Sequence, residues 1–315
     1  MSNKLEILKM IENGQISVEE GLALIEALDL TEHIDDENVK EKYVQEYTEN
    51  FSSGDLKRFD IALVSCKLNV ERSNVEDVTL EIRDDKTREL VEMPEWLTVK
   101  DDGKNISIKE TRVSNISDIF NFFKGEKNPF NVLYINVKLP KDMIVDYGKF
   151  SSVSGSITLI GLNGVEIEGK SVSGKVYATD IKAKVIQLKS ISGSVIADNV
   201  RAARAILSST SGKIKAFGSH HQVKCSSVSG GIDYEGAEVL ESFNANTVSG
   251  KVSIRVPSPE LYNLTFDSVS GSIDTSGFAI VDKNISGARR VHVTNRSERL
   301  IKASTVSGGI SLDTK

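Results

Sequence analysis

The stretch SVSGSITLIGLNGVEIEGKSVSGKV, residues 152–176, contains one short motif twice. In each copy an apolar residue is followed by Ser, Gly, a variable residue and then Val or Ile. The two apolar positions are four residues apart, so they lie on the same face of an extended strand. Each copy therefore predicts a tight bend that leads into a short, half-buried strand.

The same motif recurs to the end of the sequence. Its glycines are Gly155, Gly174, Gly193, Gly212, Gly230, Gly250, Gly271 and Gly308, with a degenerate copy at Gly287. A period of about 19 residues is shorter than that of ankyrin, tetratricopeptide or propeller repeats. It fits a coil of two strands and two bends, stacked on its neighbours. The sequence thus predicts a mainly β fold: a parallel β-solenoid (β-helix) of about 19-residue coils.

Glycine at each bend permits close backbone packing or an unusual dihedral angle. The serine directly before each glycine, such as Ser154 or Ser173, is expected to form a ladder of hydroxyl groups. Hydrogen bonding at the bend is the simpler role for this ladder, and a ligand-binding stripe is the alternative.

The solenoid is expected to cover residues 59–315, with regular coils over 141–315 and irregular first coils over 59–140. The irregular part contains a Phe-rich insertion, residues 113–130, which includes Phe120, Phe122 and Phe123. Such a segment either folds back on the solenoid as a lid or is exposed for a partner or a membrane surface.

The N-terminal residues have a different pattern. Apolar residues recur at helical spacing on either side of Gly14, and residues 17–20 form a capping box, which predicts a helical hairpin over residues 1–30. Its apolar stripe consists of Leu5, Leu8, Ile11, Leu22, Ile25 and Leu28. Two short helices cannot bury this surface alone, so we expect the hairpin to bind a protein partner or to self-associate. Residues 31–58 are acidic and are expected to act as a tether.

Composition excludes several classes of protein. Residues 1–58 carry 6 Lys+Arg against 14 Asp+Glu, and residues 151–315 carry 19 against 14. The basic excess of the repeats is too dilute to indicate nucleic-acid binding. The sequence contains neither a secretory signal nor an apolar run long enough to span a membrane, so a cytoplasmic protein is expected. The two cysteines, Cys66 and Cys225, predict small buried side chains.

Chemistry-bearing residues are sparse. His220, His221 and Cys225 have metal-ligand character, but adjacent histidines on a strand point to opposite sides, and a polar turn is the simpler interpretation. Asp180 and Asp198 could align on successive coils near Arg201 and Arg204, as in a carbohydrate-active β-helix enzyme, yet Asp is also a common turn residue. We therefore expect neither catalytic residues, nor a metal site, nor a cofactor.

Two parts of the chain resemble known domains. The SVSGxI/V repeat after a strand that ends in Val137-Lys-Leu-Pro140 resembles the bacterial putative-adhesin β-strand-repeat (DUF4097-type) family. The opening LEILKMIENGQISVEEGLALIEAL, residues 5–28, is similar to the SHOCT-like helical hairpin of its LiaX-like and YvlB-like members.

The resemblance implies a non-enzymatic protein of the Gram-positive cell-envelope stress response, linked to antimicrobial-peptide resistance. It also implies a possible association with the cell surface, and an envelope component or an antimicrobial peptide as partner. In this hypothesis the solenoid is a platform and the hairpin is the interaction element. An adhesive or structural surface protein is the alternative. Because the sequence stops just after a Ser-Gly repeat, we also expect an uncapped last coil with a tendency to end-on association, unless charges such as Arg299 and Lys302 guard it.

Overall fold

The computed structural model describes residues 56–111, 132–237, 240–275, 283–284, 290–295 and 297–314. The chain divides into two compact units, Met1–Ser52 and Ser53–Lys315. The described residues belong to the second unit, which consists almost entirely of strands. The hairpin expected over residues 1–30 and the Phe-rich insertion lie outside the described residues.

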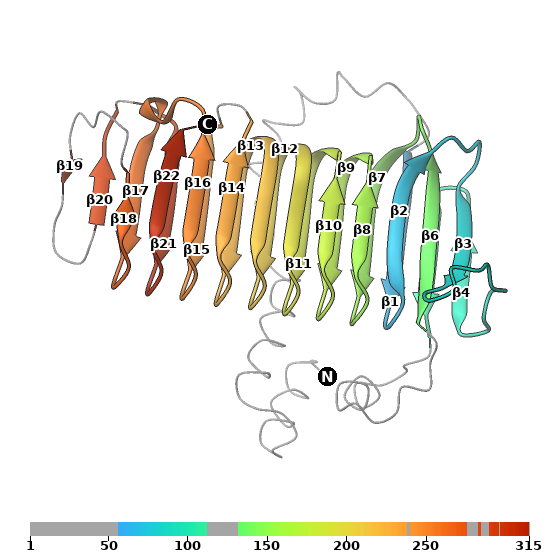
Figure 1. Ribbon diagram of the computed structural model, residues 1–315. Helices are drawn as coiled ribbons and strands as arrows, with labels where there is room; N and C mark the ends of the chain where they lie inside the picture. Colours follow the sequence, from blue (N-terminus) through green and yellow to red (C-terminus); the bar gives the residue numbers. More distant parts are fainter. Residues whose placement is uncertain are drawn as a thin grey trace, which may run out of the picture. The chain divides into compact units, whose positions relative to one another are not determined.

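The strands form two parallel walls, and each coil contributes one strand to each wall (Figure 1). In stacking order, wall 1 contains β5 (Asn105–Glu110), β1 (Leu56–Leu63), β7 (Ile144–Ser152), β9 (Asn163–Ser171), β11 (Lys182–Ser190), the second halves of β12 (Val195–Ser209) and β13 (Ile214–Ser227), β15 (Ser242–Thr247), β21 (Leu300–Thr305) and β17 (Asn263–Ser268).

Wall 2 contains β6 (Leu133–Pro140), β2 (Lys67–Ser73), β8 (Ile157–Ile160), β10 (Val176–Thr179), the first halves of β12 and β13, β14 (Ile232–Gly236), β16 (Val252–Val256), β22 (Ile310–Thr314) and β18 (Ile273–Asp274). The predicted mainly β, solenoid-like fold of parallel strands is confirmed.

Antiparallel strands flank the parallel stack. β3 (Thr79–Asp84) pairs with β6, and β4 (Leu97–Asp101) pairs with β5. At the other end β20 (Arg290–Val293) pairs with β17 and β19 (Lys283–Asn284) pairs with β20, while a short 3-10 helix, η1 (Pro259–Leu261), precedes β17. Antiparallel pairing thus covers edges that parallel coils would leave open.

Aliphatic side chains from both walls fill the interior. On wall 2 the residue two positions after seven of the eight described motif glycines points inward and is buried: Ile157, Val176, Val195, Ile214, Ile232, Val252 and Ile310. On wall 1 large and small residues alternate, so Phe150 lies beside Gly169, where a Cβ would contact the Val176 and Leu188 side chains. Cys66 and Cys225 are buried, as expected.

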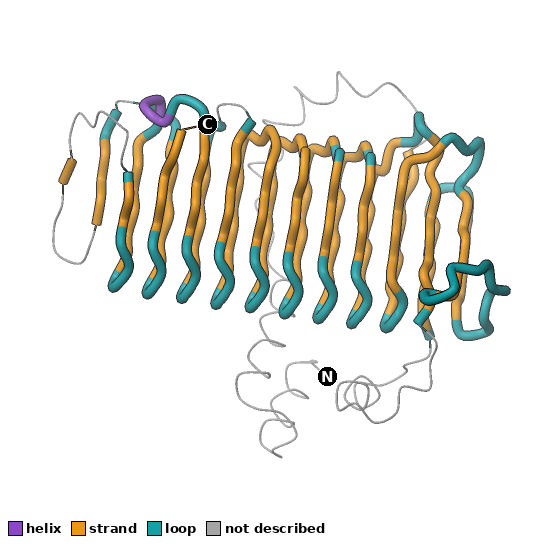
Figure 2. Tube along the Cα trace, in the orientation of Figure 1, coloured by secondary structure: helices purple, strands orange, loops and turns teal. Residues whose placement is uncertain are grey.

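The bends that carry the motif lie in one row along one edge of the solenoid, which we call the corner edge (Figure 2). A Cβ added to any of the eight described motif glycines would approach a carbonyl oxygen of the adjacent corner to between 1.6 and 2.1 Å. No side chain fits at that distance, so glycine is required by close approach and not by its backbone dihedral angles. Gly287 lies outside the described residues.

The hydroxyl ladder is made by a different serine from the expected one. At each corner the amide of the motif glycine donates to a hydroxyl three residues earlier, over 2.8–3.2 Å: Ser152, Ser171, Ser190, Ser209, Ser227, Thr247, Ser268 or Thr305. Most of these hydroxyls in turn donate to the glycine carbonyl of the adjacent corner, as Ser171 Oγ does to Gly155 O at 3.1 Å. Each hydroxyl therefore joins the glycines of two coils, a role that the serine next to glycine cannot fill because it faces outward.

The order of the coils in space differs from their order in the chain. The coil of β1 and β2 lies between the coils of β5–β6 and β7–β8. Likewise the coil of β21 and β22 lies between those of β15–β16 and β17–β18. The expectation that the last repeat forms an uncapped end is therefore wrong, and Arg299 and Lys302 belong to the penultimate coil.

Replacing Gly174 by Ala tests the close approach at the corners. The new Cβ would lie 2.0 Å from Gly155 O. We expect a loss of about 1–3 kcal/mol in the free energy of unfolding, as for other overpacked sites. Thermal unfolding followed by circular dichroism measures it.

Gly231→Ala is the matched control, because the nearest atom to its Cβ is Lys251 O at 3.2 Å and other repeats carry Ser or Lys at this position. Equal losses of stability in the two variants would contradict the proposed role of the motif glycine.

Candidate functional site

The corner edge displays one side chain per coil directly before the motif serine, and all of these side chains except Thr210 are aliphatic. Backbone bonds from each motif serine to the residue before the serine on the adjacent coil, such as Ser173 N to Val153 O at 2.8 Å, hold these side chains in one row. In stacking order the row is Val64, Val153, Val172, Ile191, Thr210, Val228, Val248, Val306 and Val269, which we call the valine ridge.

The ridge becomes more exposed toward one end of the solenoid. Val64, Val153, Val172 and Ile191 are half-buried, whereas Val228, Val248, Val306 and Val269 are 40%, 45%, 47% and 64% exposed. The four exposed valines occupy four successive coils, about 4.8 Å apart. A continuous apolar row of this kind differs from scattered surface valines, which need no explanation.

The motif serines accompany the ridge. Their hydroxyls point outward and several bind the neighbouring coil: Ser154 Oγ donates to Val64 O at 3.1 Å, and Ser270 Oγ donates to Val306 O at 3.2 Å. The corner edge is thus a periodic surface of paired apolar and hydroxyl groups, with one pair on each coil.

A buried carboxylate lies at one end of this ladder. Glu110 Oε2 accepts from the amides of Val64, Ser65 and Cys66 at 2.8, 3.1 and 3.4 Å. Glu110 Oε1 accepts from Ser65 Oγ at 3.0 Å, and the residue is 7% exposed. In the later corners a carbonyl of the preceding corner accepts from the equivalent amide, as Val64 O does from Ser154 N. At the first corner the Glu110 carboxylate takes the role of that carbonyl.

The sequence held a signal for this corner. Val64-Ser65-Cys66-Lys67-Leu68 is a motif copy with Cys in place of Gly. The adjacent strands, β5 and β6, are joined by residues 111–132, whose sequence contains no copy of the motif, so no motif glycine pairs with Cys66 on that side. A search that allows Cys at the glycine position would have found it.

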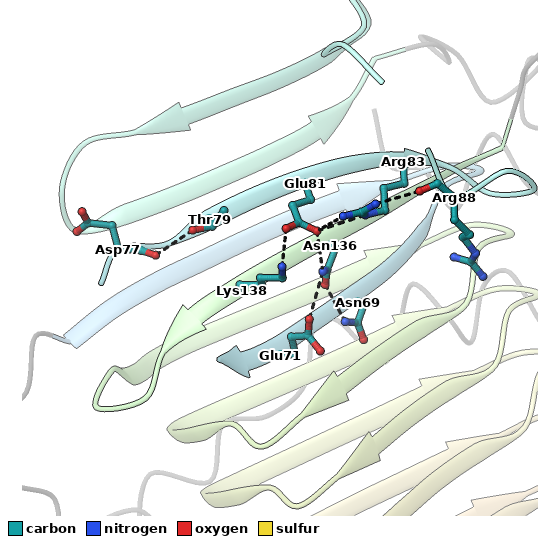
Figure 3. Close-up of polar contacts among 9 residues, drawn as sticks. All are labelled: Asn69, Glu71, Asp77, Thr79, Glu81, Arg83, Arg88, Asn136 and Lys138. Atoms are coloured by element: carbon teal, nitrogen blue, oxygen red, sulfur yellow. Dashed lines mark hydrogen bonds and ion pairs between the residues drawn. The ribbon is translucent and has the colours of Figure 1, made fainter. Parts of the chain in front are cut away.

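A charged network lies on the outer face of wall 2, near β3 (Figure 3). Glu81 on β3 binds Lys138 on β6 and Arg83 on its own strand, the latter at 3.1 Å. Asn69 Nδ2 donates to Asn136 Oδ1 at 2.7 Å, and Asn136 Nδ2 donates to Glu71 Oε1 at 3.2 Å. The hydrogen bond from Lys138 lowers the pKa of Glu81.

This network does not resemble a catalytic carboxylate pair. A general acid needs a raised pKa, whereas Glu81 is held ionised by two cations. The contacts join β2, β6 and β3, so their role is to fix the antiparallel strand on the parallel stack.

His220 and His221 point to opposite sides, as expected, but they lie within strand β13 and not in a turn. His221 is exposed and His220 is buried, with its ring 6.0 Å from that of Tyr234. Among the described residues, neither the His220 nitrogens nor the Tyr234 hydroxyl find a hydrogen-bond partner. Burial lowers the pKa of His220 to about 4, raises that of Cys225 to about 12 and raises that of Tyr234. All three groups are therefore neutral at pH 7.

The expected alignment of Asp180 with Asp198 is offset by one residue. Asp198 pairs in register with Thr179, and Asp180 is a turn residue with φ of 55° whose carboxylate accepts from the Asn199 side chain. Arg201 pairs with Lys182 on the adjacent strand. The turn interpretation of Asp180 therefore holds.

The remaining predicted contact residues, Leu5, Leu8, Ile11, Leu22, Ile25, Leu28, Phe120, Phe122 and Phe123, lie outside the described residues. Within the described ranges, no three His, Cys, Asp or Glu side chains form a group that could hold a metal ion. The same ranges contain no helix with the length and apolar character of a membrane span.

Comparisons with known proteins match both parts of the chain. The Toastrack DUF4097 family matches residues 56–313, and a SHOCT-like domain matches residues 2–29. None of the curated proteins matches significantly.

Three similar solved structures share low sequence identity with the chain. A putative adhesin from Bacteroides fragilis NCTC 9343 is 15% identical, with 83% of this chain and 93% of that chain covered and a TM-score of 0.46. A putative lipid binding protein from Parabacteroides distasonis ATCC 8503 is 17% identical, with 82% and 93% covered and a TM-score of 0.45. A putative cell adhesion protein from Clostridium sporogenes ATCC 15579 is 11% identical, with 83% and 94% covered and a TM-score of 0.27.

Glu110→Gln tests the carboxylate at the end of the ladder. The amide side chain loses the negative charge and turns an NH2 group toward backbone donors, so we expect a loss of about 1.5–3 kcal/mol, typical of hydrogen bonds to charged groups. Hydrogen exchange should accelerate at the amides of residues 64–66. The control is Asp60→Asn, which breaks only the exposed pair with Lys109 and should cost less than about 1 kcal/mol. Unchanged hydrogen exchange at the amides of residues 64–66 in the Glu110→Gln variant would refute the role of Glu110 as their acceptor.

His220 should make the fold sensitive to acid. Its pKa is about 4 in the folded chain, against 6.5 when unfolded, so the unfolded state binds the proton first as the pH falls. Stability should fall by about 1.4 kcal/mol per pH unit between pH 6.5 and about 4. Denaturant unfolding across this range should show that His220→Leu removes this slope and that His221→Asn keeps it. An identical slope in wild type and His220→Leu would exclude His220 as the cause.

Proposed function

The chain belongs to the Toastrack DUF4097 family, and we propose that it is a non-enzymatic adhesive or structural protein of the bacterial cell envelope, with the corner edge as its contact surface. The observation that carries this proposal is the valine ridge, whose four exposed valines lie on successive coils. A straight row of apolar groups beside hydroxyls suits an extended surface better than a small molecule, because it offers many equal weak contacts along a line, whereas small molecules bind in enclosed cavities.

The charge states and partners of the ionisable groups support a role without catalysis. The buried histidine, tyrosine and thiol of the core are neutral, and Glu81 is paired with cations. Acid-base or nucleophilic chemistry needs such groups poised near the working pH and open to substrate.

A finer role is favoured by the SHOCT-like match to residues 2–29. In this version the solenoid holds the protein at the envelope, and the hairpin reports envelope stress to a protein partner. The proposed place of action is then the cell surface. The two versions assign envelope binding to the same ridge, and they differ in whether residues 1–30 serve a second partner.

Substitution of the ridge tests the contact surface. The triple variant Val228→Ser, Val248→Ser and Val306→Ser removes apolar area from three successive coils without touching the core. If each valine contributes on the order of 0.5 kcal/mol, binding to isolated cell walls or membrane vesicles should weaken about tenfold. Co-sedimentation of the full chain with each fraction measures it.

The control variant Leu90→Ser, Met93→Ser and Leu261→Ser removes exposed apolar groups away from the corner edge and should bind like wild type. Equal binding by both triple variants would overturn the proposal. A chain without residues 1–30 should still co-sediment, and loss of a protein partner from that chain alone would favour the finer role.

A further inference from the structure

The coil of β21 and β22 fills a slot between two coils that follow each other in the sequence. β21 pairs with β15 on one side and β17 on the other, while β22 pairs with β16 and β18. Ile301, Ala303, Ile310 and Leu312 of this coil are buried. The inserted coil thus supplies a complete layer of both walls and of the core.

The slot is bounded by the same contacts that join all other coils. On one side Thr305 Oγ1 donates to Gly250 O at 3.2 Å, and on the other Ser268 Oγ donates to Gly308 O at 3.1 Å. Either bounding coil therefore presents a corner, a hydroxyl and two strand edges that fit any coil of the repeat. The slot therefore binds the coil of residues 297–314 through backbone pairing and through motif contacts that all coils share.

The out-of-order position means that the slot is unfilled at some stage of folding. Coils 240–256 and 263–275 are neighbours in the sequence and would stack on each other unless the later coil entered between them. Insertion therefore passes through a state in which the two coils and residues 297–314 are apart. Residues 276–296 connect this coil to the preceding one and span at most about 70 Å when fully extended, enough to reach another molecule.

From this we propose that the slot is also a self-association site, in which residues 297–314 of a second copy of the chain replace the chain's own coil. All pairings of β21 and β22 are kept in the exchanged form, as in domain swapping and strand complementation. The antiparallel strand β20 either leaves β17 or is exchanged together with the coil. Self-association then depends on protein concentration and on opening of the slot, and it is independent of the valine ridge.

Two variants, each with one introduced cysteine beside the buried Cys66 and Cys225, test the exchange. Ser253 on β16 and Ser311 on β22 are register partners with their hydroxyl oxygens 3.2 Å apart. The full chains Ser253→Cys and Ser311→Cys are mixed, held in mild denaturant, returned to buffer and oxidised. A covalent heterodimer whose disulfide joins the two introduced cysteines, identified by peptide mass spectrometry, requires the coil of one chain to lie in the slot of the other. Its yield should rise at least tenfold over that of the control and increase with protein concentration.

The matched control mixes Asp233→Cys with Ser253→Cys. These positions lie in the same row and are also register partners, but on coils that this exchange leaves within one chain. Equal heterodimer yields in the two mixtures would overturn the proposal. Light scattering of the wild type after the same treatment adds a readout without cysteine substitutions: exchange predicts dimers that persist on dilution, and a monomer at every concentration contradicts it.

Discussion

The distance between backbones at the corner edge constrains the whole solenoid. Each motif glycine places its α-carbon against a carbonyl oxygen of the adjacent corner, so close that a Cβ would fall within 2.1 Å of that oxygen. The hydroxyl three residues earlier accepts from the glycine amide and, at most corners, donates to the adjacent glycine carbonyl. A slip by one residue would place a side chain in this contact and turn the core residues outward. Register, core and exposed ridge thus follow from one repeated contact.

The repeat motif was sufficient to predict the coil, its period and its glycines, because a tight bend next to an alternating strand is a local property of the sequence. The hydroxyl ladder was assigned to the wrong serine. Ser154 and its equivalents are invariant among the motif copies, while the bridging position varies between serines such as Ser152 and threonines such as Thr247. A serine present in every motif copy suggests the ladder, but this serine faces outward. Only the geometry shows that the hydroxyl three residues before the glycine reaches two glycines.

The order of the coils could not be read from the sequence for a different reason. Every coil offers the same corner and strand edges. The periodicity therefore predicts that each coil stacks on another coil, but it does not predict which one. The same equivalence explains Cys66, which occupies the glycine position of a corner whose adjacent strands, β5 and β6, are joined without a copy of the motif.

The ladder of corners has a direction, and this makes its two ends chemically different. Amides of each corner donate to carbonyls of the one before, so the first corner presents amides and the last described corner, at Gly271, presents carbonyls. Clustered amides attract an anion, and Glu110 supplies one from within the chain. A second solenoid approaching this end would first meet the β5–β6 coil with its antiparallel strands β4 and β3. It would also have to displace a buried carboxylate with three amide bonds before its own corner could pair. Glu110 therefore disfavours end-to-end stacking at the amide end, which directs any association of copies to the sides of the solenoid or to exchange of whole coils.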